Sequence, residues 1–195
     1  MRRHASRRLS VVLGVALLIT GCGDDAADDA TSPTESTTTT RRPTTTTTDP
    51  GEALEAEVTA AYEESSRAFI HAAAIPDPNF PTLEATHTGS MLEQRRSVLR
   101  ALQAEGRVLR YPSNSRYRIE VDDDTFETES DVATFEICGV DDGERVVAAT
   151  GDAVAGGVGT VHVRVAMRRV DGVWKLAERQ QIAEWEGVAG CAAGW

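Results

Sequence analysis

The chain has 195 residues, which suits one domain with additional segments, because domains commonly span about 100–200 residues. It carries 31 acidic against 20 basic residues, a formal net charge of −11, and only 5% of its residues are aromatic. Nucleic-acid-binding proteins need a basic surface to displace counterions from phosphates, so this charge argues against that class. No window after residue 20 holds the roughly 18 apolar residues of a membrane-spanning helix.

The first residues have the features of a secretory signal peptide. Four arginines precede a short apolar run over residues 9–19. The segment Ile19-Thr20-Gly21-Cys22 then resembles the bacterial lipobox, in which the Cys is lipidated and becomes the first residue of the mature protein. The resemblance implies a signal peptide over residues 1–21 and a lipoprotein held on the extracytoplasmic face of the cell membrane through Cys22. An ordinary signal peptide with an incidental Cys is the alternative.

A tether follows the lipidated cysteine. Residues 23–50 contain no large apolar side chain, and eleven threonines lie between Thr31 and Thr48. Such a segment cannot bury enough apolar surface to offset the entropy lost on ordering. We therefore predict a disordered linker over residues 22–50 and a globular domain over residues 51–195. Whether the threonines are glycosylated stays open.

Hydrophobic periodicity predicts helices in the first part of this domain. Apolar residues recur at helical spacing over residues 52–74 and again over residues 91–102. Pro76 and Gly106 are the stop signals for these two helices, and a short helical turn is expected near Leu83.

After Gly106 the apolar period changes to two, which predicts strands. The four expected strands cover residues 116–121, 132–137, 161–168 and 174–185. The turn signals are Asp141-Asp142-Gly143, Gly156-Gly157 and Asp171-Gly172, with Asp122-Asp123-Asp124 as a further hairpin turn. Helices followed by antiparallel strands predict an α+β fold, in which N-terminal helices pack on one face of a curved antiparallel sheet as a cone-shaped roll.

The hairpin Asp171-Gly172-Val173-Trp174-Lys175-Leu176 after two or three helices resembles the nuclear transport factor 2-like (SnoaL-like) superfamily. This superfamily includes steroid isomerases and SnoaL-type cyclases, and its enzymes work in the cavity between sheet and helices. Over residues 55–192 the chain is also similar to lipoproteins of high-GC Gram-positive bacteria that carry no known activity. That similarity runs through residues 74–78, Thr88-Gly89 and residues 185–191.

The two cysteines that remain after Cys22 predict a disulfide. Cys138 follows the 132–137 strand and Cys191 lies near the C-terminus, and an even pair in an exported domain favours a bond between them. Neither has a second nearby Cys for a metal site. The chain also lacks the common catalytic, phosphate-binding and dinucleotide-binding motifs, so we expect no metal and no cofactor.

Candidate pocket residues follow from the resemblance. In the steroid-isomerase pattern an Asp is the base, while a Tyr and a protonated Asp stabilise the oxyanion. No such trio aligns with this sequence, so no catalytic residue is assigned. Tyr62 and His71 on the first helix and Glu136 on a strand are the candidates to point into a cavity, whereas His87 is expected in a loop.

A second group of polar residues alternates with the apolar residues of the strands and therefore shares one sheet face. Its members are Arg116, Arg118, His162 and Arg164, and Glu136 could belong with them. Two interpretations stay open: a solvated charge ladder with cross-strand pairs, or a groove for an anionic ligand or partner.

The sequence favours a non-catalytic domain that binds a small molecule or an envelope protein. The first alternative is an isomerase, cyclase or hydrolase-like enzyme acting on a hydrophobic substrate in the cavity between sheet and helices. The second is an interaction module that docks or dimerises through the outer face of the sheet. The fold by itself does not choose among these, because one fold hosts many functions.

Overall fold

The structure, a computed structural model, describes residues 49–191. The predicted signal peptide, the predicted lipidation site Cys22 and almost all of the predicted tether lie outside the described residues. Among the described residues, no helix has both the length and the hydropathy needed to cross a membrane.

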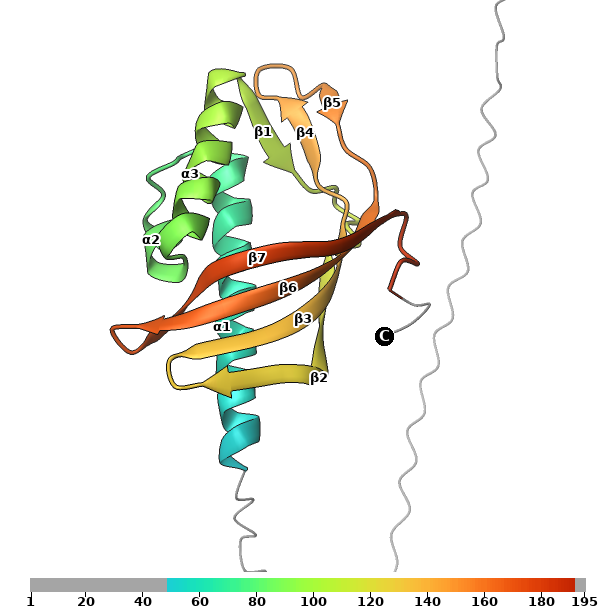
Figure 1. The fold of residues 1–195 in the computed structure, drawn as a ribbon. Coiled ribbons are helices and arrows are strands. Elements are labelled where there is room, and N and C mark those ends of the chain that lie inside the picture. The colour runs from blue at the N-terminus through green and yellow to red at the C-terminus, as the bar shows by residue number, and fades with distance from the viewer. Residues whose placement is uncertain (1–48, 192–195) are drawn as a thin grey trace, which may run out of the picture. The chain divides into compact units, whose positions relative to one another are not determined.

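Three helices open the domain, as predicted (Figure 1). They are α1 (Pro50–Ala74), α2 (Pro81–Thr86) and α3 (Gly89–Ala104). The carboxylate of Asp49 caps α1 by accepting the N–H of Gly51 at 2.8 Å. Pro50 occupies the first turn of α1, where its missing N–H costs nothing.

Within residues 49–191, seven strands form two antiparallel sheets. The strands are β1 (Arg107–Arg110), β2 (Arg118–Glu129), β3 (Val132–Asp141), β4 (Glu144–Val147), β5 (Ala153–Ala155), β6 (Gly159–Val170) and β7 (Val173–Glu186). The four predicted strands form one sheet in the order β2-β3-β6-β7, which confirms the α+β prediction. Sequence analysis missed the other sheet, β1-β4-β5, because strands of three or four residues are too short to display a period of two.

The acidic run Asp122-Asp123-Asp124, expected as a hairpin turn, lies instead inside β2. The register shifts here, since Asp122 pairs with Glu136 whereas Glu127 pairs with Thr134. Thr125 stabilises this bulge: its hydroxyl donates to the Asp122 carbonyl at 2.7 Å and accepts the N–H of Glu136 at 2.8 Å. Bulges bend a strand and increase its twist, so this segment adds curvature to the sheet.

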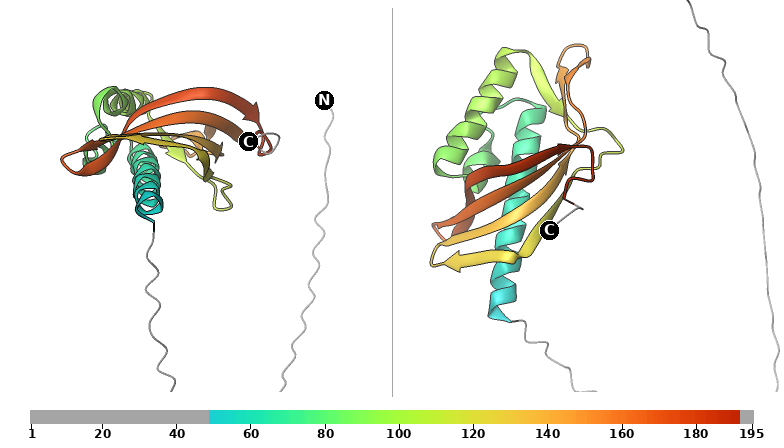
Figure 2. Two further views of the ribbon diagram at one scale, coloured as in Figure 1. Left: turned by 60° about the horizontal axis from the view of Figure 1, so that its bottom comes forward. Right: turned by 45° about the vertical axis from the view of Figure 1, so that its right-hand side comes forward.

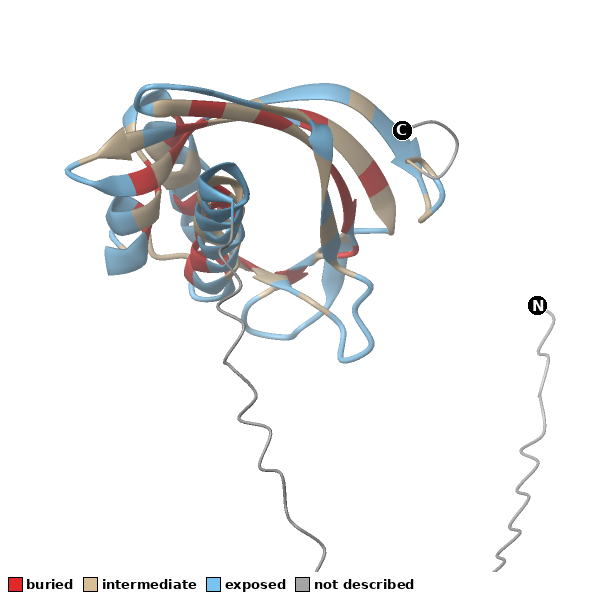
Figure 3. Ribbon diagram, turned by 90° about the horizontal axis from the view of Figure 1, so that it is seen from below, coloured by how far each residue is buried: buried red, intermediate tan, exposed pale blue. Residues whose placement is uncertain are grey.

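The helices lie on one side of the four-stranded sheet, which arches around α1 (Figures 2 and 3). The buried residues Phe135 and Ile137 of β3 and Val163 and Val165 of β6 form one core cluster with Val58 and Tyr62 of α1, and the residues between them along the strands are mostly half-buried. Tyr62 of α1 contacts Phe135 of β3 in a T-shaped arrangement, with ring centroids 5.7 Å apart. The core therefore lies between α1 and the concave face of the sheet.

A disulfide joins Cys138 to Cys191 on the outer face of this sheet, which confirms the predicted pairing. Beyond β7 the chain turns back at Gly187, whose N–H donates to the Val158 carbonyl at 2.8 Å. The buried hydroxyl of Thr160 donates to the Gly187 carbonyl at 2.6 Å. These contacts bring the tail back to β3.

Reducing this disulfide should lower the free energy of unfolding by up to about 4 kcal/mol, because it closes a loop with a sequence separation of 53 residues. Urea denaturation with and without reductant measures the difference. The double variant Cys138→Ser, Cys191→Ser is the control and should not respond to reductant. Equal stability of the oxidised and reduced wild type would contradict the expectation.

Candidate functional site

A cavity of about 160 Å³, partly open to solvent, lies between the helices and the two sheets. Its walls come from α1, α3, β1, β2, β3, β6, β7 and the segment that joins β1 to β2. The polar side chains that line it are Tyr62, Ser66, Arg95, Tyr111, Tyr117, Asp141 and Arg179. The cavity is therefore polar and charged on part of its wall.

All three tyrosines of the chain line this one cavity. Burial raises the pKa of Tyr62, and burial raises the pKa of Tyr117 to about 12. Burial, reinforced by the neighbouring Asp141 carboxylate, also raises the pKa of Tyr111. At neutral pH all three phenols are therefore protonated and can donate hydrogen bonds into the cavity.

Two guanidinium groups reach the cavity from different elements. Arg95 comes from α3, and its guanidinium carbon lies 4.0 Å from the centre of the Phe69 ring. Arg179 comes from β7, where it pairs in register with the inward-facing Val165. Among the described residues, no carboxylate oxygen lies within 4.0 Å of either group, and the Nε atom of Arg95 is buried without a hydrogen-bond partner.

Burial lowers the pKa of Arg95 to about 10, and repulsion by Arg179 acts in the same direction. Arg95 is nevertheless cationic at neutral pH, as its pKa lies well above 7. Taking a charge out of water costs several kcal/mol unless an opposite charge accompanies it. The cavity thus has a local excess of positive charge in a protein whose net charge is −11.

Asp141 is the acidic residue among those that line this cavity, and it is exposed. It lies near the hydroxyl of Tyr111, whose pKa it helps to raise, and its carboxylate accepts the N–H of Gly143 at 2.8 Å. Tyr111 also packs on Gly143, where a Cβ atom would lie only 3.0 Å from its ring. The turn after β3 therefore fixes the position of Tyr111 through a close approach that glycine permits.

Asp142 of the same turn anchors the segment that carries Tyr111 and Tyr117. Its carboxylate accepts the Ser115 hydroxyl at 2.6 Å and the Arg116 N–H at 2.6 Å. Burial acts to raise the pKa of Asp142, but these two hydrogen bonds together lower it below its usual value. The segment between β1 and β2 is thus held against the end of β3.

Of the three candidate pocket residues, the structure brings Tyr62 alone to the cavity wall. His71 is exposed in the last turn of α1, one residue beyond Ile70, which does line the cavity. Glu136 lies on the outer face of β3, because its neighbours Phe135 and Ile137 take the inward positions. The sequence-based placement of His71 and Glu136 in the pocket therefore needs correction.

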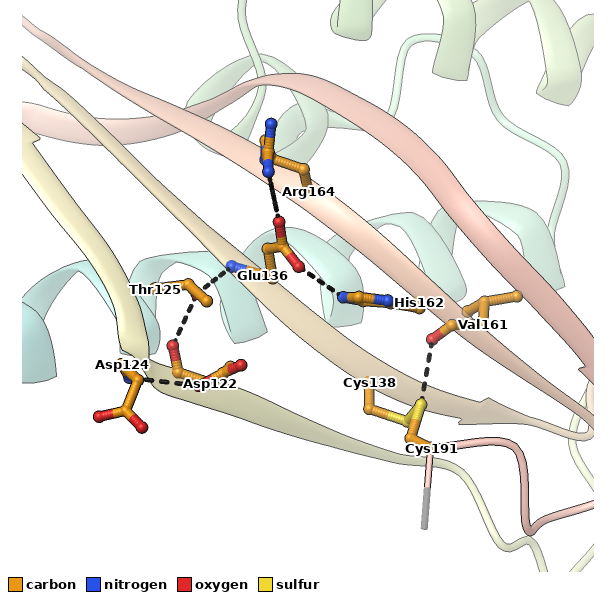
Figure 4. A network of polar contacts seen from close by, with 9 residues as sticks. All are labelled: Asp122, Asp124, Thr125, Glu136, Cys138, Val161, His162, Arg164 and Cys191. Atoms are coloured by element: carbon orange, nitrogen blue, oxygen red, sulfur yellow. Dashed lines mark hydrogen bonds and ion pairs between the residues drawn. A yellow bond between two sulfur atoms is a disulfide. The ribbon is translucent and has the colours of Figure 1, made fainter. Parts of the chain in front are cut away.

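Glu136 belongs instead to a network on the outer face (Figure 4). One carboxylate oxygen accepts from Arg164 at 2.6 Å, and the other lies 2.7 Å from Nε2 of His162. The Arg164 hydrogen bond lowers the pKa of Glu136, and His162 adds to the effect. Glu136 lies on β3, and its two partners lie on the neighbouring strand β6, next to the Cys138–Cys191 disulfide.

The other two arginines assigned to this face do not join the network. Arg118 lies on β2 and pairs with Glu120 of the same strand at 3.0 Å. Arg116 precedes β2, where the residues are not in a strand, and it is exposed. Across β3 and β6 the outer face carries an ion pair between Glu136 and Arg164, with His162 within hydrogen-bond distance of the same carboxylate.

Apart from Tyr62, the polar residues of the cavity were not predicted from the sequence, although one of them, Arg95, leaves a signal there. Arg95 interrupts the apolar stripe of α3 between Met91 and Leu99, and a charged residue on a buried helix face needs a partner or a ligand. Arg179 gave no such signal, because a register shift between Ala166 and Met167 changes which residues of β7 face inward.

His87, expected in a loop, is buried at the end of α2, with 1% of its surface exposed. Its ring Nδ1 lies 2.9 Å from the Thr86 hydroxyl, and its backbone N–H donates to the Leu83 carbonyl at 2.8 Å. Burial, helped by the charge of Arg95, lowers the pKa of His87 to about 4. The imidazole is therefore neutral at pH 7.

This pKa makes stability depend on pH. The pKa of this imidazole in the unfolded chain is about 6.5. As the pH falls from 6.5 to 4, the unfolded chain therefore binds more protons than the folded protein, and the free energy of unfolding decreases by about 2–3 kcal/mol in total. His87→Gln should remove this share of the pH dependence, measured by urea denaturation at pH 7 and pH 4.5. The exposed variant His71→Gln is the control and should retain it. Identical pH profiles for wild type and His87→Gln would contradict the assignment.

No group of three or more His, Cys, Asp or Glu side chains suited to a metal ion occurs within residues 49–191. The cavity offers guanidinium, phenol and hydroxyl groups, which donate hydrogen bonds and favour negative charge. Apart from the Asp141 carboxylate at the exposed side, this set of groups can bind an anion.

No family model matches the chain, and no curated protein matches it. Among solved structures, the intermembrane space region of the chloroplast protein ARC6 is 17% identical, with a TM-score of 0.54, over 70% of this chain and 98% of that one. At this identity the likeness shows the fold alone.

Two further structures are more distant. The Kfla4162 protein from Kribbella flavida is 14% identical, with a TM-score of 0.43, over 69% of this chain and 95% of that one. A ketosteroid isomerase-like protein from Erwinia carotovora atroseptica is 16% identical, with a TM-score of 0.41, over 66% of this chain and 95% of that one. Neither is similar enough to support an inference about this chain.

Proposed function

We propose that this chain is a lipid-anchored extracytoplasmic protein whose α+β domain binds a small anionic molecule in the cavity between the helices and the sheets. The arrangement of the domain is consistent with the nuclear transport factor 2-like roll, in which ligands lie at this position. The proposal refines the binding function favoured by the sequence, and it makes no claim of catalysis.

The observation that carries the proposal is the guanidinium of half-buried Arg95, whose Nε atom is buried without a hydrogen-bond partner. It has no carboxylate partner among the described residues, and Arg179 brings a second positive charge into the same cavity. An unneutralised buried charge lowers stability, and a bound anion would supply the missing counter-charge. The phenol of Tyr62, close to both arginines, would donate a further hydrogen bond.

The outer face is a weaker candidate for the ligand site. There Glu136 already accepts hydrogen bonds from Arg164 and is in contact with His162, so an arriving anion would compete with an existing carboxylate. In the cavity, no carboxylate of the described part of the chain lies within ion-pair distance of Arg95. The difference in pairing, rather than the number of basic residues, distinguishes the two places.

Thermal unfolding in a panel of small anions at constant ionic strength tests the cavity. At least one anion should raise the melting temperature, because a ligand present at about 100 times its Kd stabilises the folded state by about 2.7 kcal/mol. Arg95→Met should abolish this shift. Arg96→Met is the matched control, since the adjacent Arg96 pairs with Glu84 and Glu93 outside the cavity. A panel without effect, or equal shifts in both variants, would refute the proposal.

The anchoring part of the proposal has its own test. Cys22→Ser should move the protein from the membrane fraction to the medium and abolish labelling with a radioactive fatty acid, because the thiol of Cys22 is the expected acceptor of the lipid. The double variant Cys138→Ser, Cys191→Ser is the control and should stay labelled. Membrane association that survives Cys22→Ser would exclude the lipid anchor.

A further inference from the structure

We infer that the cavity takes a small monocarboxylate whose apolar body is planar and about the size of one benzene ring. The inference rests on the proposed function, since it names the class of anion that the same site would hold. Three features of the cavity lead to it: its charge, its volume and its apolar wall.

The balance of charge in the cavity calls for a single negative charge. Arg95 and Arg179 contribute two positive charges, and Asp141 contributes one negative charge at the exposed side. Asp141 accepts the N–H of Gly143 at 2.8 Å and, among the described residues, lies outside ion-pair distance of both arginines. One further anionic charge neutralises the set, whereas a phosphate dianion would exceed it.

The donors near that charge suit a carboxylate. Arg95 presents a guanidinium whose Nε–H is buried without an acceptor, and guanidinium groups bind the two oxygens of a carboxylate in a planar fork. Arg179 and the phenol of Tyr62 lie close enough to each other to interact. A carboxylate can therefore accept hydrogen bonds from three elements, α1, α3 and β7.

The volume limits the rest of the molecule. A cavity of about 150 Å³ accommodates a benzene molecule in another protein, and this cavity measures about 160 Å³. A body of several fused rings would extend out of the cavity into solvent. One ring or its aliphatic equivalent is the size that the walls enclose.

The remaining wall is apolar and aromatic. Its members are Phe69, Ile70, Leu109, Ile119, Ile137, Val140 and Val161. Tyr111 and Tyr117 add a T-shaped pair with ring centroids 5.4 Å apart. Aromatic edges and faces of this kind favour a planar ring over a hydrated polar body.

Fluorine NMR of the purified full chain labelled with 3-fluorotyrosine tests the inference directly. The chain has three tyrosines and all of them line the cavity, so three signals report on this one place. The probes are benzoate, the neutral benzamide, acetate and sulfate, each titrated at constant ionic strength. Benzoate should shift the tyrosine signals and saturate, and should bind at least about tenfold more tightly than each of the other three probes.

Variants identify the groups that bind the carboxylate. Arg95→Met and Arg179→Met should each weaken benzoate binding at least about tenfold, whereas Arg96→Met should leave it unchanged. Arg95→Lys keeps the charge without the planar fork and should bind benzoate with intermediate affinity. If one of the two methionine variants fails to fold, the other still carries the test.

The outcomes separate this inference from the proposed function. Acetate or sulfate that shifts the tyrosine signals as strongly as benzoate would overturn the ring-sized carboxylate but leave an anion site in the cavity. Benzoate binding that survives both methionine substitutions would overturn the inference, because the arginines would not bind the carboxylate. If no anion of this set or of the thermal panel has any effect, both proposals fail.

Discussion

The curvature of the four-stranded sheet around α1 is the constraint on which the rest of the structure depends. One face of β3 and β6 is apolar and must be buried, and α1 supplies Val58 and Tyr62 as the facing surface. A flat sheet would contact one helix along a line, whereas an arched sheet surrounds it. The bulge at Thr125 in β2 and the register shifts in β7 supply this bend, because extra residues in one strand increase local twist.

The cavity is a consequence of the same curvature. Where the segment between β1 and β2 joins the wall, phenols and guanidinium groups occupy positions that apolar side chains fill elsewhere in the core. An unneutralised Arg95 at such a place reduces stability, and an apolar residue of similar size would pack there without that penalty. This cost is the reason for proposing that the cavity binds an anion, since function is commonly gained at the expense of stability.

The two faces of the sheet have different organisation. The concave face holds the core and the cavity, while the outer face carries the polar network of Glu136, His162 and Arg164 and the Cys138–Cys191 disulfide. Strand alternation alone assigns residues to one of two faces but not to the inner or outer one. This is why Glu136 was compatible with either face before the structure was known.

The sequence by itself determined the long helices, the four long strands and the disulfide, because periodicity and cysteine parity are local or countable properties. It did not determine the cavity. Tyr111 lies in a segment without regular periodicity, Tyr117 lies in an expected strand whose inward face the sequence does not identify, and Arg179 faces inward only through a register shift in β7. Tertiary structure decided that these residues meet Tyr62 and Arg95, since their convergence depends on sheet curvature and on short strands that local patterns do not reveal.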